Sequence, residues 1–272
     1  MREDVHEDVE RVIELAVGKR HARGAFYDGA RMAPVALHHD PLALRERYAS
    51  ADPFPHIALD NLFDDDVLER IVAEFPTPDE MRWNRFDSDT EKKLGYFHEF
   101  SIVSPFTRSF LDAMNGFEML LYLEKLTGID GLIPDPYFGG GGLHQIEPGG
   151  FLKVHADFNV HPKLKIDRRL NMLIYINKNW RDEWGGQLEL WNRDVTECRQ
   201  RIAPLFNRTV IFSTTDTSFH GHPHPLASPP GVTRKSVSLY YYTAGRPEAE
   251  RSEAHDTIFR EAGAEVPRRL GS

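Results

Sequence analysis

The second half of the chain constrains the fold most, because short strand-like runs recur there with turn residues between them. Six such runs lie in the second half, at 143–146, 151–158, 169–177, 187–191, 208–213 and 234–243. One more lies earlier, at 53–60. Regularly spaced short strands are typical of an antiparallel sandwich or barrel. We therefore predict a mainly β protein with helices packed outside its sheet.

Helices are predicted in the first half. Apolar stripes, capping residues and prolines at first helical positions mark helices that begin near Asp40, Asp64 and Ser104. The last of these is interrupted at Asn115-Gly116 and ends at Gly128, a residue type that commonly terminates helices. These helices are most simply packing elements and carry no sign of a ligand.

The chain divides into three parts by its patterns. Residues 1–50 are interpreted as an N-terminal helical extension, with an amphipathic helix expected over 5–16. Residues 51–245 form the main domain. Residues 246–272 form a C-terminal tail, rich in Arg, Glu and Ala, in which a helix is expected through 257–260.

Composition excludes several kinds of partner. The 272 residues carry a formal net charge of −9, whereas nucleic acids and anionic membranes require clustered positive charge. Cys198 is the only cysteine, so neither an intrachain disulfide nor a cysteine-rich zinc cluster can form. Without a signal-peptide core or an apolar run of roughly 20 residues, we expect a cytoplasmic protein. A second copy of the chain is a candidate partner.

Histidines and one carboxylate mark a candidate metal site. Successive side chains of a strand alternate between its faces, so His155 and Asp157 on the strand 151–158 point the same way. About sixty residues later another strand leads to His220, His222 and His224. Two histidines and a carboxylate on one face of an octahedral ion leave three positions open, as in non-haem Fe(II) oxygenases.

An anion-binding group follows the histidines. Arg234 opens the strand 234–243, and its guanidinium can pair bidentately with a carboxylate. Ser236 and Ser238 lie at strand spacing from Arg234, so their hydroxyls face the same side. The sequence thus predicts a carboxylate ligand near the metal site.

Several motifs appear in a fixed order along the chain. They are Pro148-Gly149-Gly150-Phe151-Leu152, His155-Ala156-Asp157-Phe158-Asn159, Arg169-Leu170-Asn171 through Tyr175-Ile176-Asn177, Trp184-Gly185-Gly186-Gln187-Leu188-Glu189-Leu190-Trp191, and His220 with Arg234. In this order they resemble the prolyl-4-hydroxylase-like branch of the 2-oxoglutarate- and Fe(II)-dependent oxygenases. The resemblance covers roughly residues 53–245.

The resemblance implies a fold and a set of roles. The fold would be a double-stranded β-helix, a jelly-roll of two facing sheets, and residues 51–245 would be the dioxygenase domain. His155, Asp157 and a distal histidine would bind Fe(II). The cosubstrate 2-oxoglutarate, used together with O2, would contact four residues, Arg234, Ser236, Asn171 and Tyr175, although Tyr175 also suits the core and Asn171 a strand end.

The same resemblance favours one of the three distal histidines. The distal ligand of the family ends a strand, and His220 lies nearest to the end of the preceding strand-like run. Prolines follow His222 and His224 directly, which biases both toward an extended loop. We therefore predict His220 as the ligand, with His222 as the alternative, and a loop at the mouth of the site from His222 onward.

The implied reaction is hydroxylation of an unactivated C–H bond, with 2-oxoglutarate converted to succinate and carbon dioxide. Desaturation or ring closure would use the same ligands. The substrate would be an amino acid, a residue of a peptide or protein, or a small natural product, contacted by the segments 80–100, 137–145 and 159–168. The basic and aromatic stretches within 80–100 could cover an acidic or amphipathic substrate, but we predict that they lie in a partly buried surface loop.

Two other classes of protein also suit a jelly-roll with a metal site. One is a non-oxidative protein, either a cupin-type isomerase or a sugar-binding module, against which Arg234 and Ser236 argue. The other is a zinc hydrolase, which requires a general base near a metal-bound water. Glu147 is the candidate for that base.

Overall fold

The computed structural model describes residues 36–80, 83–96 and 103–263, so the helix predicted over 5–16 lies outside the described residues. The helices are α2 (Pro41–Ala49), α3 (Asp65–Ala73), α4 (Pro105–Met114) and α5 (Phe117–Thr127). The strands are β1 (His56–Asp60), β2 (Asn84–Asp87), β3 (Glu91–Tyr96), β4 (Ile133–Pro134), β5 (Gly142–Ile146), β6 (Phe151–Ala156), β7 (Asp167–Tyr175), β8 (Leu188–Trp191), β9 (Cys198–Ile202), β10 (Arg208–Ser213), β11 (His220–His222), β12 (Arg234–Thr243) and β13 (Ile258–Phe259).

The helix boundaries follow the local signals in the sequence. The side chain of Asp40 accepts a hydrogen bond from the amide of Leu42 at the start of α2, and Ser104 caps α4 in the same manner. Gly128 ends α5 with a φ of 73°, a left-handed conformation that glycine adopts without strain. The predicted helices near 40, 64 and 104 are confirmed.

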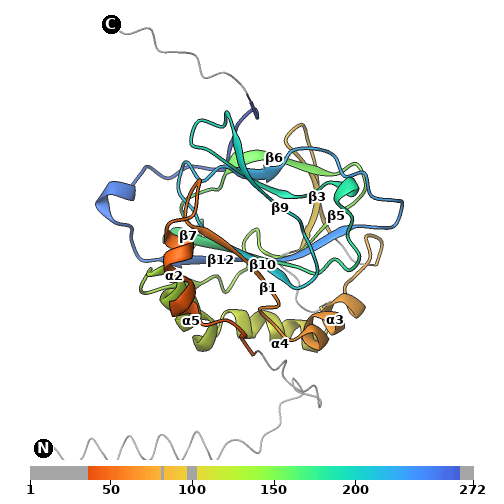
Figure 1. Cartoon of the computed structure of the whole chain (residues 1–272), viewed down its shortest axis with the longest axis horizontal. Coiled ribbons are helices and arrows are strands. Elements are labelled where there is room, and N and C mark those ends of the chain that lie inside the picture. The colour runs from red at the N-terminus through yellow and green to blue at the C-terminus, as the bar shows by residue number, and fades with distance from the viewer. Residues whose placement is uncertain (1–35, 81–82, 97–102, 264–272) are drawn as a thin grey trace, which may run out of the picture. The chain divides into compact units, whose positions relative to one another are not determined.

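The strands form a nearly closed antiparallel sheet, and Figure 1 shows helices α3, α4 and α5 along one side of it. The hydrogen-bonded order is β1-β10-β7-β12-β5-β3-β6-β11-β8-β9. All six strands predicted between 143 and 243 are present, so the mainly β fold with flanking helices is confirmed. Within the described ranges, no helix is long and apolar enough to cross a membrane.

Strand alternation separates the main core from the interior of the roll. On β7, Leu170, Met172 and Ile174 belong to the hydrophobic core that includes the helices, while Asn171 lines the interior cavity. On β12, Val237 likewise faces the helical core, whereas the residues with even numbers from Arg234 to Tyr240 line the cavity. The two-residue period thus places polar side chains together inside the roll.

Two predictions about segments outside the regular strands were wrong. The stretch within 80–100, predicted to be a surface loop, forms the β2–β3 hairpin, and β3 bridges β5 and β6. The tail was predicted to be helical at 257–260, but β13 pairs there with β6, with Phe259 opposite His155. Both segments gain backbone partners from strands distant in sequence, which local propensity does not report.

Candidate active site

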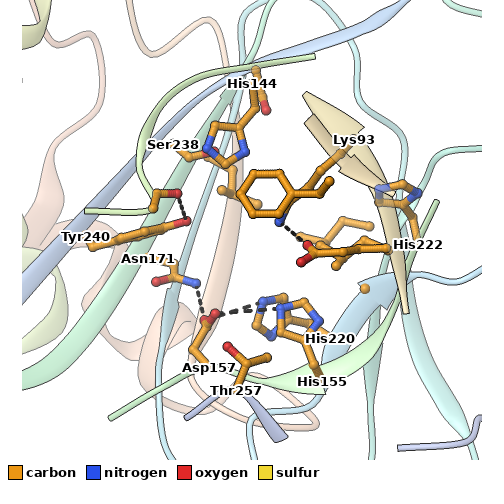
Figure 2. Close-up of a pocket in the computed structure, with 18 of the residues that line it drawn as sticks. Lys93, His144, His155, Asp157, Asn171, His220, His222, Ser238, Tyr240 and Thr257 are labelled. Atoms are coloured by element: carbon orange, nitrogen blue, oxygen red, sulfur yellow. Dashed lines mark hydrogen bonds and ion pairs between the residues drawn. The ribbon is translucent and has the colours of Figure 1, made fainter. Parts of the chain in front are cut away.

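A cavity of about 340 Å³ lies inside the roll, and we call it the central pocket. Its walls come from β2, β3, β5, β6, β7, β8, β11 and β12, and from Thr257 and Phe259 of the C-terminal segment. Figure 2 shows its polar side chains pointing into one space. Most of the residues singled out in the sequence therefore meet in a single place.

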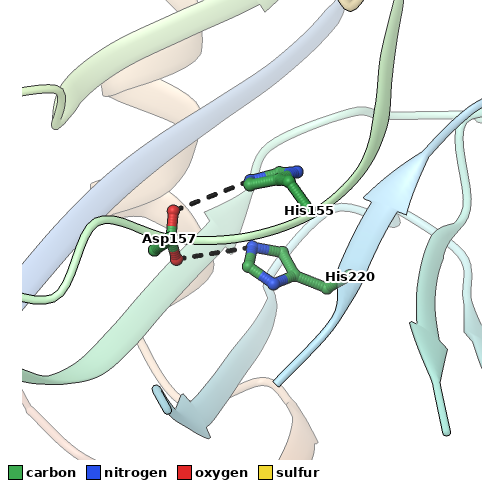
Figure 3. Close-up of side chains that lie close together, drawn as sticks. All are labelled: His155, Asp157 and His220. Atoms are coloured by element: carbon green, nitrogen blue, oxygen red, sulfur yellow. Dashed lines mark ion pairs between the residues drawn. The ribbon is translucent and has the colours of Figure 1, made fainter. Parts of the chain in front are cut away.

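His155, Asp157 and His220 converge at one end of the central pocket (Figure 3). His155 and His220 lie opposite each other on the paired strands β6 and β11, and Asp157 directly follows β6. The Nε2 atoms of His155 and His220 lie 3.6 Å from Oδ1 and Oδ2 of Asp157, respectively. In the described part of the chain, these three residues are the one group whose ligand atoms all lie within 4.8 Å of one another.

Backbone contacts orient both imidazoles toward the carboxylate. Nδ1 of His155 donates to the carbonyl of Lys153 at 2.9 Å, and Nδ1 of His220 donates to the carbonyl of Ser218 at 2.9 Å. A carbonyl can only accept, so the proton of each neutral ring lies on Nδ1 and the lone pair lies on Nε2. This is the tautomer that a metal ligand requires.

The protonation states also suit a cation. Burial, followed by the charge of His155, lowers the pKa of His220 to about 4. Burial acts to raise the pKa of Asp157, but the charges of Arg168 and His220 outweigh it and hold that pKa well below its ordinary value. A neutral imidazole and an ionised carboxylate are the forms that bind a divalent metal, so this donor set fits Fe(II).

Two neighbouring side chains hold Asp157 in place. Asn171 donates from Nδ2 to Oδ2 of Asp157 at 2.7 Å, and the guanidinium of Arg168 lies 3.2 Å from the same oxygen. Arg168 also donates twice to Oδ1 of Asn171, at 3.0 and 2.7 Å, and its guanidinium lies 3.6 Å from the centre of the Tyr240 ring. Arg168 is 1% exposed, so this network is shielded from water.

Sequence reasoning missed Arg168 for a structural reason. Strict alternation would put Arg168 and Asn171, three residues apart, on opposite faces of β7. The β7–β12 register shifts between Tyr241 and Tyr242, which pair with Leu170 and Arg168. Arg169 is therefore the extra residue of a bulge, and a bulge re-aims the side chains beyond it. No signal in the sequence marks this bulge.

Arg234 and Tyr175 lie together in the interior of the roll. Arg234 donates from Nε to the carbonyl of Gly186 at 2.8 Å and from Nη2 to the hydroxyl of Tyr175 at 3.0 Å. Gly186 has a φ of 74°, and a Cβ there would lie 3.0 Å from the Arg234 side chain. Ser236 lines the same pocket and pairs with Tyr175 across the strands.

Of the remaining candidates His222, His224 and Glu147, only His222 lines the central pocket. His222 ends β11 and is buried in the central pocket, so the loop predicted from His222 onward begins only after it. His224 is exposed on that loop. Glu147 is ion-paired with Arg85 at 3.5 Å and does not line the central pocket, which removes the support for a hydrolase that uses it as a base.

A second cavity of about 370 Å³ adjoins the central pocket and shares Gly140 and Phe158 with it. Its lining includes His255 and Asp256 of the C-terminal segment. This segment is tied to the roll by Asn159, whose amide donates to the carbonyl of Glu253 at 2.8 Å. The C-terminal residues thus form walls of both cavities.

A family-level comparison agrees with this geometry. Residues 141–242 match the 2OG-Fe(II) oxygenase superfamily. Similar solved structures include a Pseudomonas putida prolyl-4-hydroxylase (16% identity, 75% of this chain and 100% of that chain, TM-score 0.55) and a prolyl 4-hydroxylase from Phytophthora capsici (18%, 80% and 70%, 0.51). Another is HygX from Streptomyces hygroscopicus with nickel and 2-oxoglutarate bound (11%, 82% and 98%, 0.50).

At these identities the solved structures establish the fold alone, a jelly-roll. The matched region contains His155, Asp157, His220 and Arg234, all of which line the central pocket. The region 141–242 is thus similar to the 2OG-Fe(II) oxygenase superfamily in sequence and in its metal-ligand set, and the chain is a dioxygenase that uses Fe(II), 2-oxoglutarate and O2.

Proposed function

We propose that His155, Asp157 and His220 bind Fe(II), and that the enzyme uses it to hydroxylate an unactivated C–H bond. The observation that carries this proposal is the convergence of two Nε2 atoms and a carboxylate within 4.8 Å, with both Nδ1 atoms already bonded to backbone carbonyls. Three protein ligands on one face leave positions for cosubstrate and O2.

Arg234, Tyr175 and Ser236 bind the distal carboxylate of 2-oxoglutarate in this proposal. Arg234 supplies the charge, and its hydrogen bonds to Gly186 and Tyr175 fix the guanidinium plane before a ligand arrives. Asn171 was assigned to the cosubstrate from the sequence, and it lines the pocket. Its amide nitrogen bonds Asp157, which supports a role in orienting that ligand as well.

Bound iron with 2-oxoglutarate supplies oxygen activation and decarboxylation, which yields succinate and carbon dioxide. The protein then has to hold the substrate and exclude competing water. Asp157 would supply the carboxylate ligand that halogenating relatives lack, which favours hydroxylation. We infer a small-molecule or peptide substrate that enters through the second cavity, because that cavity adjoins the metal end at Phe158. A homodimer stays a prediction.

Two measurements test the proposed function. Anaerobic addition of Fe(II) and 2-oxoglutarate should give a weak visible charge-transfer band, since the cosubstrate would chelate the metal. Succinate formation across a panel of peptides, amino acids and small natural products should then identify the substrate class. Metal-replete protein without the band would instead favour a non-oxidative jelly-roll.

A further inference from the structure

His222 is a buried side chain that the metal site does not use. It is 4% exposed, it ends β11 opposite Leu152 of β6, and it lines the central pocket. Neither Nδ1 nor Nε2 of His222 has a hydrogen-bond partner among the residues that the structure describes. Nε2 of His144, on the wall formed by β5, is also buried and unpaired, but this ring bonds the backbone of Gly140 and Gly141 through its other nitrogen, so Nε2 of the neutral ring can only accept.

Unpaired buried polar atoms of this kind call for an explanation. A neutral imidazole carries one donor and one acceptor, and the great majority of buried polar side-chain atoms in proteins are bonded. His222 could relieve the cost of burial by turning toward solvent, yet its strand pairing holds it inside the roll. A pocket-lining donor without a protein partner points to a ligand that accepts from it.

The position of His222 indicates which ligand this is. Figure 2 shows Lys93, His144 and His222 across the pocket from His155, Asp157 and His220, so a ligand held at the metal end extends toward them. Arg234 lines the same pocket, and His144 lies opposite Ser236 on the paired strands β5 and β12, two residues from Arg234. Arg234 and His222 therefore face one space.

The charges near His222 favour a carboxylate. Lys93 is already paired with Glu91 at 2.8 Å. Arg234, by contrast, forms no ion pair with a carboxylate of the described residues and bonds only neutral groups. An imidazole presents an N–H in either protonation state, and both nitrogens of His222 lack a partner among the described residues, so this ring can donate. One buried cation with an N–H donor in the same pocket suits one anionic group.

We propose that His222 donates an N–H hydrogen bond to the distal carboxylate of bound 2-oxoglutarate, beside Arg234. The inference rests on the proposed function, because it takes the metal end to be where the 2-oxo acid group binds. It makes His222 a cosubstrate-binding residue that discriminates a dicarboxylate from a monocarboxylate, and it removes His222 as an alternative iron ligand.

The test compares two ligands that share the 2-oxo acid end. Under anaerobic conditions, 2-oxoglutarate and 2-oxopentanoate, which lacks the distal carboxylate, are titrated into Fe(II)-loaded protein by calorimetry. His222→Phe should weaken 2-oxoglutarate roughly tenfold, because a hydrogen bond to a charged group is lost, and should leave 2-oxopentanoate within about twofold. Fe(II) affinity, measured separately, should not change.

Three further variants complete the design. His224→Phe alters the exposed histidine two residues away and should behave as the parent protein does. His222→Gln keeps an N–H donor and should retain most of the affinity for 2-oxoglutarate. His222→Leu removes the donor with a smaller side chain, so it should show the same ligand-selective loss even where His222→Phe fails to fold.

The results distinguish a failure of the proposed function from a failure of the role proposed for His222. If the parent protein binds Fe(II) but not 2-oxoglutarate, the proposed function itself fails. If the parent binds both and the variants His222→Phe and His222→Leu bind 2-oxoglutarate as tightly as the parent, the role of His222 is wrong. Equal weakening of both ligands would also overturn it, because the distal carboxylate would then not be the group recognised.

Discussion

The two ends of the central pocket differ in how fully their polar groups are paired. At the metal end, both imidazoles bond backbone carbonyls through Nδ1, and Oδ2 of Asp157 contacts Asn171 and Arg168. At the opposite end, Arg234 is anchored, but His222 has no partner in the described part of the chain. The protein alone fixes the metal ligands, whereas the opposite end retains donors for a ligand.

This difference has a physical reason. A metal ligand must present a lone pair in one direction, so its other atoms are best held by the protein before the metal arrives. A cosubstrate that binds and leaves in every cycle has to exchange its hydrogen bonds with the pocket. Unpaired donors at that end therefore have a function, at the cost of some stability.

The largest expected difference between the two ends of the pocket is the difference in turnover between variants of His220 and His222. His220→Ala removes a metal ligand and should abolish iron-dependent turnover, whereas His222→Ala should retain iron binding and much of the turnover at saturating 2-oxoglutarate. Fe(II) titration against a chelator and succinate formation measure the two effects. The reverse ranking would mean that the ligand is His222.

Loss of Arg168 should weaken the metal end next. Arg168→Met keeps the length of the side chain but removes the charge that holds Asp157, so metal affinity should fall roughly 10- to 100-fold. Arg169→Met is the matched control, because Arg169 pairs instead with Glu250 at 3.3 Å. Equal losses in the two variants would show that Arg168 does not position Asp157.

Arg234→Ala should affect only the end of the central pocket that lies opposite the metal ligands. It removes a charge-assisted contact worth about 1.5–3 kcal/mol and should raise the 2-oxoglutarate requirement roughly 10- to 100-fold, with Fe(II) affinity unchanged. Initial rates at varied 2-oxoglutarate measure this, with Lys235→Ala as the control. An unchanged requirement would place the cosubstrate elsewhere.

The smallest expected effect is on stability against pH. Burial, followed by the charge of Lys93, lowers the pKa of His144 to about 3 from an unfolded value of 6.5. The unfolded chain therefore binds a proton that the folded chain does not, and stability falls as pH drops from 6.5 toward 3. At pH 5 this group should cost about 2 kcal/mol relative to neutral pH.

Denaturant unfolding of the chelator-treated protein at pH 7 and pH 5 measures this difference. His144→Phe should make the pH dependence shallower by about that amount, while His224→Phe should leave it unchanged. If His144→Phe had no effect on the slope, the imidazole would already take up its proton in the folded protein.

Part of the site was predictable because its signals are local. Two-residue alternation on one strand places His155 and Asp157 together, and the same period carries Arg234 and Ser236 into one pocket. The boundaries of α4 and α5 were predictable for the same reason, since Ser104 and Gly128 act on their own turns. In each case the relevant physics acts within a few residues.

Other features depend on pairings that the sequence does not mark. The strand β9, with three exposed polar residues, and the two-residue β13 are strands only because β8 and β6 lie beside them. The burial of His222 arises in the same way, since the prolines after it favour a loop but the pairing with Leu152 extends β11 to include it.

The class of fold and the chemistry of the metal end follow from the sequence, because period-two alternation, helix caps and the order of the motifs are local signals. Which further groups meet in the pocket depends on how distant strands pair. A bulge between β7 and β12 turns Arg168 toward Asp157, and the closing of the roll brings His222 and His144 to the end where Arg234 lies. Register and closure are set by contacts between distant strands, and no short stretch of sequence contains them.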